Sequence, residues 1–300
     1  MKKYIILPLV CVALAACEKT IDFDIPYDPP KLTIDVKLQS EQIPKAIVGT
    51  SQFSMSSKNP KLDSLSEVFL YEDGILIDEF LPRRYSSNIY DSQGRPITAY
   101  YYEGNYRPMP GHTYEVKAQR EGFTEASGSG YMYEPVEIFQ SNYDTETGDL
   151  VVSFVDPAGE GDYYRVSIFP RGQGSDSYYN SIFGTYDPTI EFFETEDIDD
   201  FFDTNGLTFG YAGYLKDEFF DGKLKKLKLV YYGGYEEEPQ TNSFDIIIER
   251  ITEDYYKHER SKALQFIDNP FSEPTPLYGN IKNGYGIVGT AGVSRVYIQP

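Results

Sequence analysis

The chain has 300 residues, and its 47 acidic and 27 basic side chains give a formal net charge of −20, which disfavours nucleic acid and other anionic surfaces and favours cationic ligands. Two cysteines and two histidines leave no basis for a disulfide framework or a histidine-rich zinc or iron site. With 28 tyrosines, 19 phenylalanines, 25 glycines and 19 prolines, the composition is typical of many short strands broken by turns.

The first sixteen residues have the pattern of a secretory signal. Lys2 and Lys3 supply a positive start, an apolar run follows, and Ala15-Ala16 supply small residues before a cut. The apolar run is too short to span a bilayer stably. Residues 1–16 are therefore predicted to be a signal peptide that is removed.

The sequence Leu14-Ala15-Ala16-Cys17 resembles the lipobox of bacterial lipoproteins, in which the chain is cut before the cysteine and lipid is attached to it. We predict that Cys17 is the first mature residue and carries diacylglycerol and acyl lipid, and we expect no other cofactor. The alternative is an ordinary signal whose cysteine is accidental. Cys11 leaves with the signal, so the mature chain has no disulfide and no reactive thiol.

Residues 17–30 are acidic and then proline-rich, which predicts a tether. Glu18, Asp22 and Asp24 resemble the export signal that carries lipoproteins of Bacteroidota to the outer face of the outer membrane. The alternative is that these acids only keep a linker solvated. We therefore expect an outer-membrane lipid anchor and favour the cell surface over the periplasmic face.

The segment from 31 to 134 predicts an antiparallel sandwich. In KLTIDVKL the apolar residues from Leu32 to Leu38 alternate with polar ones, as a half-buried strand requires. Asp73-Gly74 stands between two such runs and is a strong hairpin signal. Strands recur about every ten residues, which is typical of sandwiches.

A second, larger antiparallel β domain is predicted over 135–300, after a boundary marked by Gly128, Gly130 and Pro135. Its strands are expected in GDLVVSFVD, DYYRVSIFP, KLKKLKLVYYGG and SFDIIIERI. One helix is expected near 252–267, capped by Thr252, with an apolar stripe of four residues. These are Tyr255, Tyr256, Leu264 and Ile267.

The chain resembles a lipoprotein family typical of Bacteroidota, known as domain of unknown function 4249. The segments that carry the resemblance follow in this order: IPYDPPKLTIDVKL, VFLYEDG, GHTYEVKAQREGFTEASG, FVDPAGEGDYYRV, KDEFFDGK, DYYKHERSKALQF and NPFSEPTPLYGNIKNGYGIVG. The resemblance implies an N-terminal immunoglobulin-like β-sandwich followed by a larger β-rich domain, and it transfers no catalytic residue. It also implies, by association alone, a role beside TonB-dependent outer-membrane transporters.

Two of these segments also predict loops from their residues alone. Asp156 in FVDPAGEGDYYRV is expected to accept backbone N–H bonds, and Asp221-Gly222 is expected to close KDEFFDGK. We interpret both as architecture rather than as ligand contacts.

Calcium is the metal ion that the composition suggests, because carboxylates are concentrated in the segment from 187 to 203. An EF-hand does not fit, since Phe201 and Ala212 would occupy ligand positions one and twelve. We predict no metal site. An irregular calcium loop is the alternative to a solvated acidic loop, with the candidate ligands Asp197, Asp199, Asp200 and Asp203.

Tyrosine runs offer flat rings with hydroxyl groups, which suit carbohydrate stacking, peptide contact or a protein interface. The alternative is that these tyrosines lie on exposed strand faces or complete the core. AYYYEGNY is one such run. The residues that we expect to contact a ligand or partner are Tyr178, Tyr179, Tyr231, Tyr232 and Tyr235.

These observations lead to one functional expectation with two alternatives. We expect a non-enzymatic outer-membrane lipoprotein that binds a glycan or peptide ligand, or a partner, and serves a TonB-dependent transporter in nutrient uptake. The first alternative is a structural or adhesive envelope module. The second is a glycan or peptide hydrolase that uses a pair of carboxylates.

Overall fold

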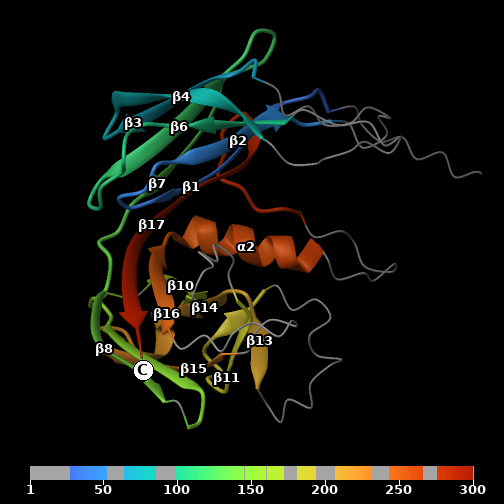
Figure 1. Ribbon diagram of the computed structural model, residues 1–300. Helices are drawn as coiled ribbons and strands as arrows, with labels where there is room; N and C mark the ends of the chain where they lie inside the picture. The colour runs from blue at the N-terminus through green and yellow to red at the C-terminus, as the bar shows by residue number, and fades with distance from the viewer. Residues whose placement is uncertain are drawn as a thin grey trace, which may run out of the picture.

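The computed structural model describes residues 28–52, 64–85, 99–144, 146–159, 161–171, 181–193, 207–231, 243–265 and 276–299. Over these residues the protein is mainly β, as the sequence predicts. Figure 1 shows two layered β lobes with helix α2 between them. The signal peptide, Cys17 and most of the tether lie outside the described residues.

The N-terminal lobe is built from seven strands and the first half of the last strand of the chain. The seven strands are β1 (Leu32–Gln39), β2 (Lys45–Thr50), β3 (Glu67–Glu72), β4 (Ile75–Tyr85), β5 (Ala99–Glu103), β6 (Thr113–Gln119) and β7 (Ala126–Tyr131). In one layer the strands lie side by side in the order β1–β2–β5–β4, and in the other layer their order is β4–β3–β6–β7. Strand β4 belongs to both, since its first half pairs with β3 and its second half pairs with β5.

The core of this lobe forms where the two layers face each other. Leu32, Ile34, Val36 and Leu38 are at most 1% exposed, while Asp35 between them is exposed, so the predicted alternation of β1 is confirmed. Each such side chain contributes about 1.5–3 kcal/mol by leaving water. The buried partners in the other strands include Val48, Val68, Leu70, Phe80, Tyr102, Tyr114 and Val116.

The hairpin between β3 and β4 turns at Asp73 and Gly74, which have φ values of 48° and 83°. A two-residue turn with positive φ at both positions matches the twist of the flanking strands, which explains the Asp-Gly pair. The predicted hairpin is confirmed.

The C-terminal lobe also has two layers. Its strands are β8 (Glu137–Asp144), β9 (Asp149–Val155), β10 (Tyr163–Arg171), β11 (Phe183–Thr185), β12 (Glu191–Phe192), β13 (Thr208–Gly210), β14 (Gly213–Lys216), β15 (Leu224–Tyr231), β16 (Ser243–Ile251) and β17 (Gly284–Ile298). One layer has the order β12–β14–β10–β16–β17, and the other has the order β13–β11–β15–β9–β8. Apolar side chains such as Val152, Phe154, Tyr164, Ile168 and Leu229 fill the space between the layers.

Strand β17 joins the two lobes. Residues 284–291 pair in parallel with β1, and residues 291–298 pair antiparallel with β16 (Figure 1). A single twelve-stranded sheet therefore runs from one lobe into the other. Strand β17 passes β1 so closely that Gly286, at φ 109°, has no room for a side chain, because an added Cβ would lie 2.0 Å from the carbonyl oxygen of Ile34.

Helix α2 (Glu253–Gln265) packs on the outer face of the C-terminal sheet, and a short 3-10 turn (Asp217–Phe219) precedes β15. Tyr255 and Tyr256 are each 3% exposed and contact Tyr214 and Ile251. Thr252 caps the start, where its Oγ1 accepts a hydrogen bond from the Tyr255 amide at 3.4 Å.

One expectation for this helix is wrong. The sequence places Leu264 in the apolar stripe, but this residue is 41% exposed, and Ile267 lies outside the described residues. The apolar contacts of the helix come from Tyr255 and Tyr256, whereas Leu264 and Gln265 at its C-terminal end are exposed. Its buried face is partly polar, with His258, Glu259 and Ser261. In the described part of the chain no helix has the length and apolar character needed to cross a membrane.

Candidate functional site

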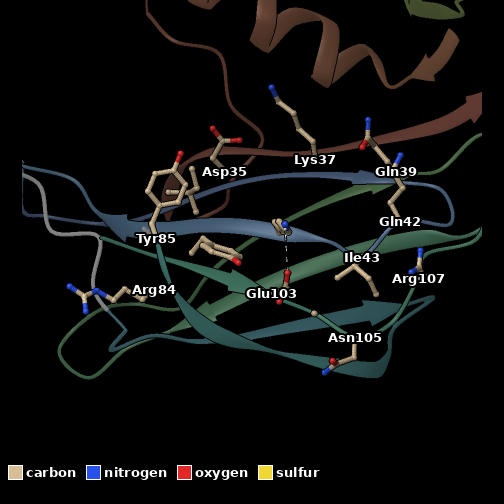
Figure 2. Close-up of a pocket in the computed structure, with 14 residues that line it drawn as sticks. Asp35, Lys37, Gln39, Gln42, Ile43, Arg84, Tyr85, Glu103, Asn105 and Arg107 are labelled. Carbon is tan, nitrogen blue, oxygen red and sulfur yellow. Dashed lines mark ion pairs between the residues drawn. The ribbon is translucent and has the colours of Figure 1, made fainter. Parts of the chain in front are cut away.

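An open groove of about 1180 Å³ lies on the outer face of the N-terminal lobe, on the side that faces α2 (Figure 2). Its floor is the face of the β1–β2–β5–β4 layer that turns away from the core. The lining residues are Asp35, Lys37, Gln39, Gln42, Ile43, Lys45, Ile47, Arg84, Tyr85, Tyr101, Glu103, Gly104, Asn105 and Arg107.

The same alternation that buries the core positions of β1 projects its polar residues into this groove. Asp35, Lys37 and Gln39 are successive outward positions of β1, and Figure 2 shows them pointing toward α2. Ile47 of β2 stands opposite Asp35, and Lys45 of β2 stands opposite Glu103 of β5. Side chains from β1, β2 and β5 therefore meet on one surface.

One end of the groove is aromatic and apolar. Tyr85 is 51% exposed and Ile47 is 48% exposed. The rings of Tyr85 and Tyr101 meet edge to face, with centroids 6.5 Å apart and planes at 89°. The ammonium of Lys45 lies 5.5 Å from the ring centroid of Tyr101. This end offers an open tyrosine ring to a flat ligand surface.

The other end is polar and is held by backbone contacts. Oδ2 of Asp78 accepts hydrogen bonds from the amides of Asn105 and Tyr106, at 2.6 and 2.9 Å, and so fixes the turn after β5. Arg107 donates from Nη1 to the carbonyl oxygen of Glu41 at 2.6 Å. These bonds fix the backbone at Asn105 and the guanidinium of Arg107, both of which line the groove.

Two lining residues also connect the groove to the C-terminal lobe. Lys37 lies 2.6 Å from Glu259 of α2, and Gln39 donates a hydrogen bond to Glu249 of β16. Glu249 is fully buried and also pairs with Arg165. The wall formed by β1 is therefore fixed against the second lobe.

The positive charges of the groove have few partners. Glu103 is shared between Lys45 at 3.7 Å and Arg83 at 3.3 Å. Within the described ranges Arg107 contacts only a neutral carbonyl group. Arg84 makes no ion pair there, but it alternates with Tyr85 on β4 and projects from the other face of the sheet (Figure 2). Exposed pairs of this length contribute little stability, so Lys45 and Arg107 are available to a ligand.

A second polar cluster lies in the C-terminal lobe, where two of the predicted loops meet. Asp156, Asp162 and Asp217 are buried and place carboxylate oxygens within 4.8 Å of one another. Arg250 donates to both oxygens of Asp162, with bonds of 2.7 to 2.9 Å. The guanidinium therefore supplies the positive charge that this set of carboxylates needs.

Backbone and hydroxyl donors satisfy the other two carboxylates. Asp156 accepts bonds from the Gly222 amide and the Tyr164 hydroxyl, and Asp217 accepts from the Gly161 amide. Burial raises the pKa of Asp156 and of Asp162 above the ordinary value. These bonds tie the 156–162 loop to the 217–222 loop, and the interpretation of Asp156 as architecture is supported.

Of the residues predicted to form a site, the structure describes Tyr231, which does not line the groove. Tyr231 is half-buried and packs against Phe244, with ring centroids 4.8 Å apart, at the edge of the C-terminal core. The other four tyrosines, the four candidate calcium ligands and Cys17 lie outside the described residues. These are Tyr178, Tyr179, Tyr232 and Tyr235, and Asp197, Asp199, Asp200 and Asp203.

Sequence reasoning missed most of the groove. Tyr101 belongs to the AYYYEGNY run, but nothing in that run distinguishes it from its buried neighbour Tyr102. The signal that could have found the groove is the set of polar residues on the outward face of β1, namely Asp35, Lys37 and Gln39. Three charged or amide residues on one face of a strand indicate that this face does not pack into the apolar core.

The fold and groove define a two-lobed, mainly β protein with a ligand-sized polar groove on one sandwich. The family model described as "Domain of unknown function (DUF4249)" matches residues 18–296, and the chain belongs to this family. The resemblance read from the sequence is thereby confirmed.

The other comparisons add little. A search of curated proteins finds no match. Among solved structures, a chain described as "Cytokine receptor complex - Crystal form 1A" aligns over 89% of this chain and 95% of its own length, with 8% sequence identity and a TM-score of 0.22. A TM-score this low does not establish a shared fold.

Proposed function

We propose that this protein is a lipid-anchored binding protein of the outer membrane that captures a ligand in the groove and works beside a TonB-dependent transporter without catalysing a reaction. The observation that carries the proposal is the groove itself. It combines an exposed tyrosine ring, amide side chains and the Arg107 guanidinium on one face of a sheet, which is the composition of a recognition surface.

The positions of the histidines also favour binding over catalysis. His112 lies 2.7 Å from Asp73 at the β3–β4 turn, and His258 is buried on α2, where it contacts the carbonyl group of Tyr278. Neither lines the groove. The groove carboxylate Glu103 is held between Lys45 and Arg83, which suits a structural ion pair better than a general acid.

The predicted lipidation of Cys17 supports the cellular part of the proposal, since several acyl chains on one residue would hold a protein at a membrane. Metabolic labelling with a fatty acid tests it directly. We expect label on the wild-type chain and none on Cys17→Ala. Protease treatment of intact cells then distinguishes the outer face from the periplasmic face.

Co-purification tests the functional part. Full-length protein is cross-linked in cells and isolated from membranes, and we expect a TonB-dependent transporter among its partners. Growth on a transported nutrient is expected to fall in the double variant Tyr85→Ala/Arg107→Ala and to stay normal in Tyr186→Ala, whose tyrosine is 60% exposed away from the groove. Normal growth of the double variant would contradict the proposal, and altered adhesion in its place would favour an adhesive module.

A further inference from the structure

The tether joins the folded protein at the start of β1, where several contacts hold it. The Lys31 amide donates to the Ser51 hydroxyl group at 2.9 Å, and the Ser51 amide donates to the Lys31 carbonyl oxygen at 2.8 Å. The Lys31 ammonium lies 3.2 Å from the Asp28 carboxylate and 3.3 Å from the Tyr285 hydroxyl group, which also bonds to Asp28. The tether therefore leaves the protein at one defined end of the N-terminal lobe, which we call the tether end.

The length of the tether limits how far the tether end can lie from the predicted lipid. Residues 17–27 precede Asp28, and an extended chain of that length spans at most about 40 Å. Strand β17 leads away from the same end, since Gly284 stands beside Leu32, and its 15 residues cover about 50 Å along the strand. If Cys17 carries lipid, the tether end stays close to the membrane, whereas the far end of β17 has room to lie well away from it.

Aromatic and apolar side chains are exposed at the tether end. Ile47 is 48% exposed, Tyr85 is 51% exposed and Tyr285 is 44% exposed. The start of β1, the end of β2, the start of β5 and the end of β4 lie together, because these strands alternate in direction. Ile47 stands opposite Asp35, and Tyr285 stands beside Thr33. The three exposed side chains therefore share the outward face of the sheet, since paired residues point to the same side.

Basic side chains accompany these rings, although the chain as a whole is acidic. Arg84 precedes Tyr85 at the end of β4, and Lys282 precedes the start of β17. Neither makes an ion pair within the described ranges. Two carboxylates of the same end are engaged elsewhere, Asp28 with the tether lysine and Glu125 with a glutamine amide at 2.6 Å. Guanidinium and ammonium groups both bind phosphate, so the tether end offers cations to lipid headgroups.

A peptide partner fits this end less well than a lipid surface does. Residues 81–85 of β4 pair with β5 alone, which leaves a free sheet edge to which a peptide can add as a strand. Pro82 has no N–H group to donate there, and Arg83 and Arg84 place charges beside it, two features that typically prevent strand addition. Headgroups need no row of backbone donors. Tyrosine rings flanked by lysine and arginine are typical of membrane–water interfaces.

The groove opens at the same end. Ile47 and Tyr85 line its aromatic part, and Figure 2 shows Asp35 on that side and Gln39 on the opposite side. Building on the proposed lipid anchor and binding role, we infer that the tether end lies on the lipid headgroups, with Ile47, Tyr85 and Tyr285 at the interface. A ligand that leaves the groove past Tyr85 then reaches the membrane surface, where the transporter of the proposed function would lie.

The chain contains no tryptophan, so one introduced tryptophan can report contact with lipid. Full-length lipoprotein carrying Ile47→Trp, Tyr85→Trp or Tyr285→Trp is reconstituted into vesicles of phosphatidylcholine and phosphatidylglycerol, with and without bromine on the acyl chains. Each tryptophan is expected to emit at shorter wavelength and to lose at least about half of its emission to brominated lipid, because interfacial rings lie beside the acyl chains. The matched control is Tyr297→Trp, at the far end of β17, whose tyrosine is 49% exposed. We expect no quenching there.

A second set of variants tests the contact with phosphate. Arg84→Gln/Lys282→Gln, combined with Tyr285→Trp, is expected to reduce the quenching about twofold, since each cation near an anionic surface adds to the attraction. Raising the salt concentration is expected to act in the same direction. Lys223→Gln/Lys226→Gln removes two exposed cations of the C-terminal lobe and is the matched control, with no expected change. Circular dichroism melting confirms that each variant is folded.

The outcomes separate this inference from the proposed function, because flotation with the vesicles reports the lipid anchor and quenching reports the orientation. Protein that floats with unquenched tether-end tryptophans overturns the inference and leaves the anchor intact, as does equal quenching of Tyr285→Trp and Tyr297→Trp. Protection of these tryptophans only in native membranes assigns the surface to a protein partner and also overturns the inference. Quenching as expected, with normal nutrient uptake in Tyr85→Ala/Arg107→Ala, supports the inference and removes the binding role. Protein that does not float removes both the anchor and the inference.

Discussion

Two ion pairs, one in each lobe, differ in how far they are exposed to solvent. In the C-terminal lobe Arg250 and Asp162 are 14% and 6% exposed and pair at 2.7 Å. In the N-terminal lobe Lys45 is 62% exposed, and its distance to Glu103 is 3.7 Å. The Lys45–Glu103 pair of the N-terminal lobe is therefore open to solvent, whereas the Arg250–Asp162 pair of the C-terminal lobe is sealed into the architecture of that lobe. Ligand chemistry is expected where the charges are free, and stability is expected to depend on them where they are closed in.

The largest expected loss of stability comes from removing one partner of the buried Arg250–Asp162 pair. Arg250→Ala leaves Asp162 buried beside Asp156 and Asp217 without its cation, and we expect a loss of about 3–5 kcal/mol in the free energy of unfolding. Urea unfolding measures it.

Two further variants control this prediction. Asp162→Asn combined with Arg250→Met is expected to recover part of the loss, because no unpaired buried charge remains. Arg295→Ala, at an arginine that is 51% exposed, is expected to cost about 1 kcal/mol or less. A similar cost for Arg295→Ala and Arg250→Ala would remove the contrast between open and closed pairs.

The second effect concerns the strand that joins the lobes. Gly286→Ala forces both a positive φ and a clash with Ile34, and we expect a loss of about 2–4 kcal/mol. Gly74→Ala is the matched control, since Gly74 has positive φ but nothing within 4 Å of an added Cβ. It is expected to cost about 1 kcal/mol.

Hydrogen exchange shows where the damage falls. In Gly286→Ala the amides of β1 are expected to lose protection before those of β10 and β16, because β17 also pairs with β16 beyond the clash. Equal loss in both lobes would indicate that the shared strand makes them one cooperative unit.

The third prediction is that removing exposed side chains around the groove hardly changes stability. Tyr85→Ala and Arg84→Ala are each expected to change the free energy of unfolding by about 0.5 kcal/mol or less, because both side chains are exposed. The neighbouring Tyr102→Ala, which empties a fully buried site, is expected to cost about 3–5 kcal/mol. Thermal or urea unfolding decides it, and a large cost for Tyr85→Ala would assign the groove to stability rather than to binding.

The smallest effect is a pH dependence confined to the acidic cluster of the C-terminal lobe. Burial raises the pKa of Asp156, and the nearby charges of Asp217 and Asp221 raise it further, against the bonds from Tyr164 and Gly222. The unfolded carboxyl group therefore loses its proton first as pH rises. Wild-type stability is expected to fall relative to Asp156→Asn between pH 3.8 and the raised folded pKa. Urea unfolding across this range that showed the reverse slope would contradict the assignment.

How much was predictable depends on how far apart the interacting residues lie in the chain. The strand faces, the Asp73-Gly74 turn and the α2 cap follow from neighbouring residues, and all could be read directly. The groove could not, because it needs Lys37, Lys45 and Arg107 on one surface. Their meeting depends on β2 pairing with β5 across a long gap in sequence, a register that local periodicity does not encode.

The sequence by itself determined that the chain is a strand-rich member of its family, and which side of each strand is apolar, because alternation follows from the two-residue period of the strand. Only the tertiary structure decided which polar faces adjoin, that β17 serves both lobes, and that one acidic cluster contains its own arginine. These outcomes depend on long-range strand order and on which charges are sealed from water, and both are properties of the assembled sheets rather than of any segment.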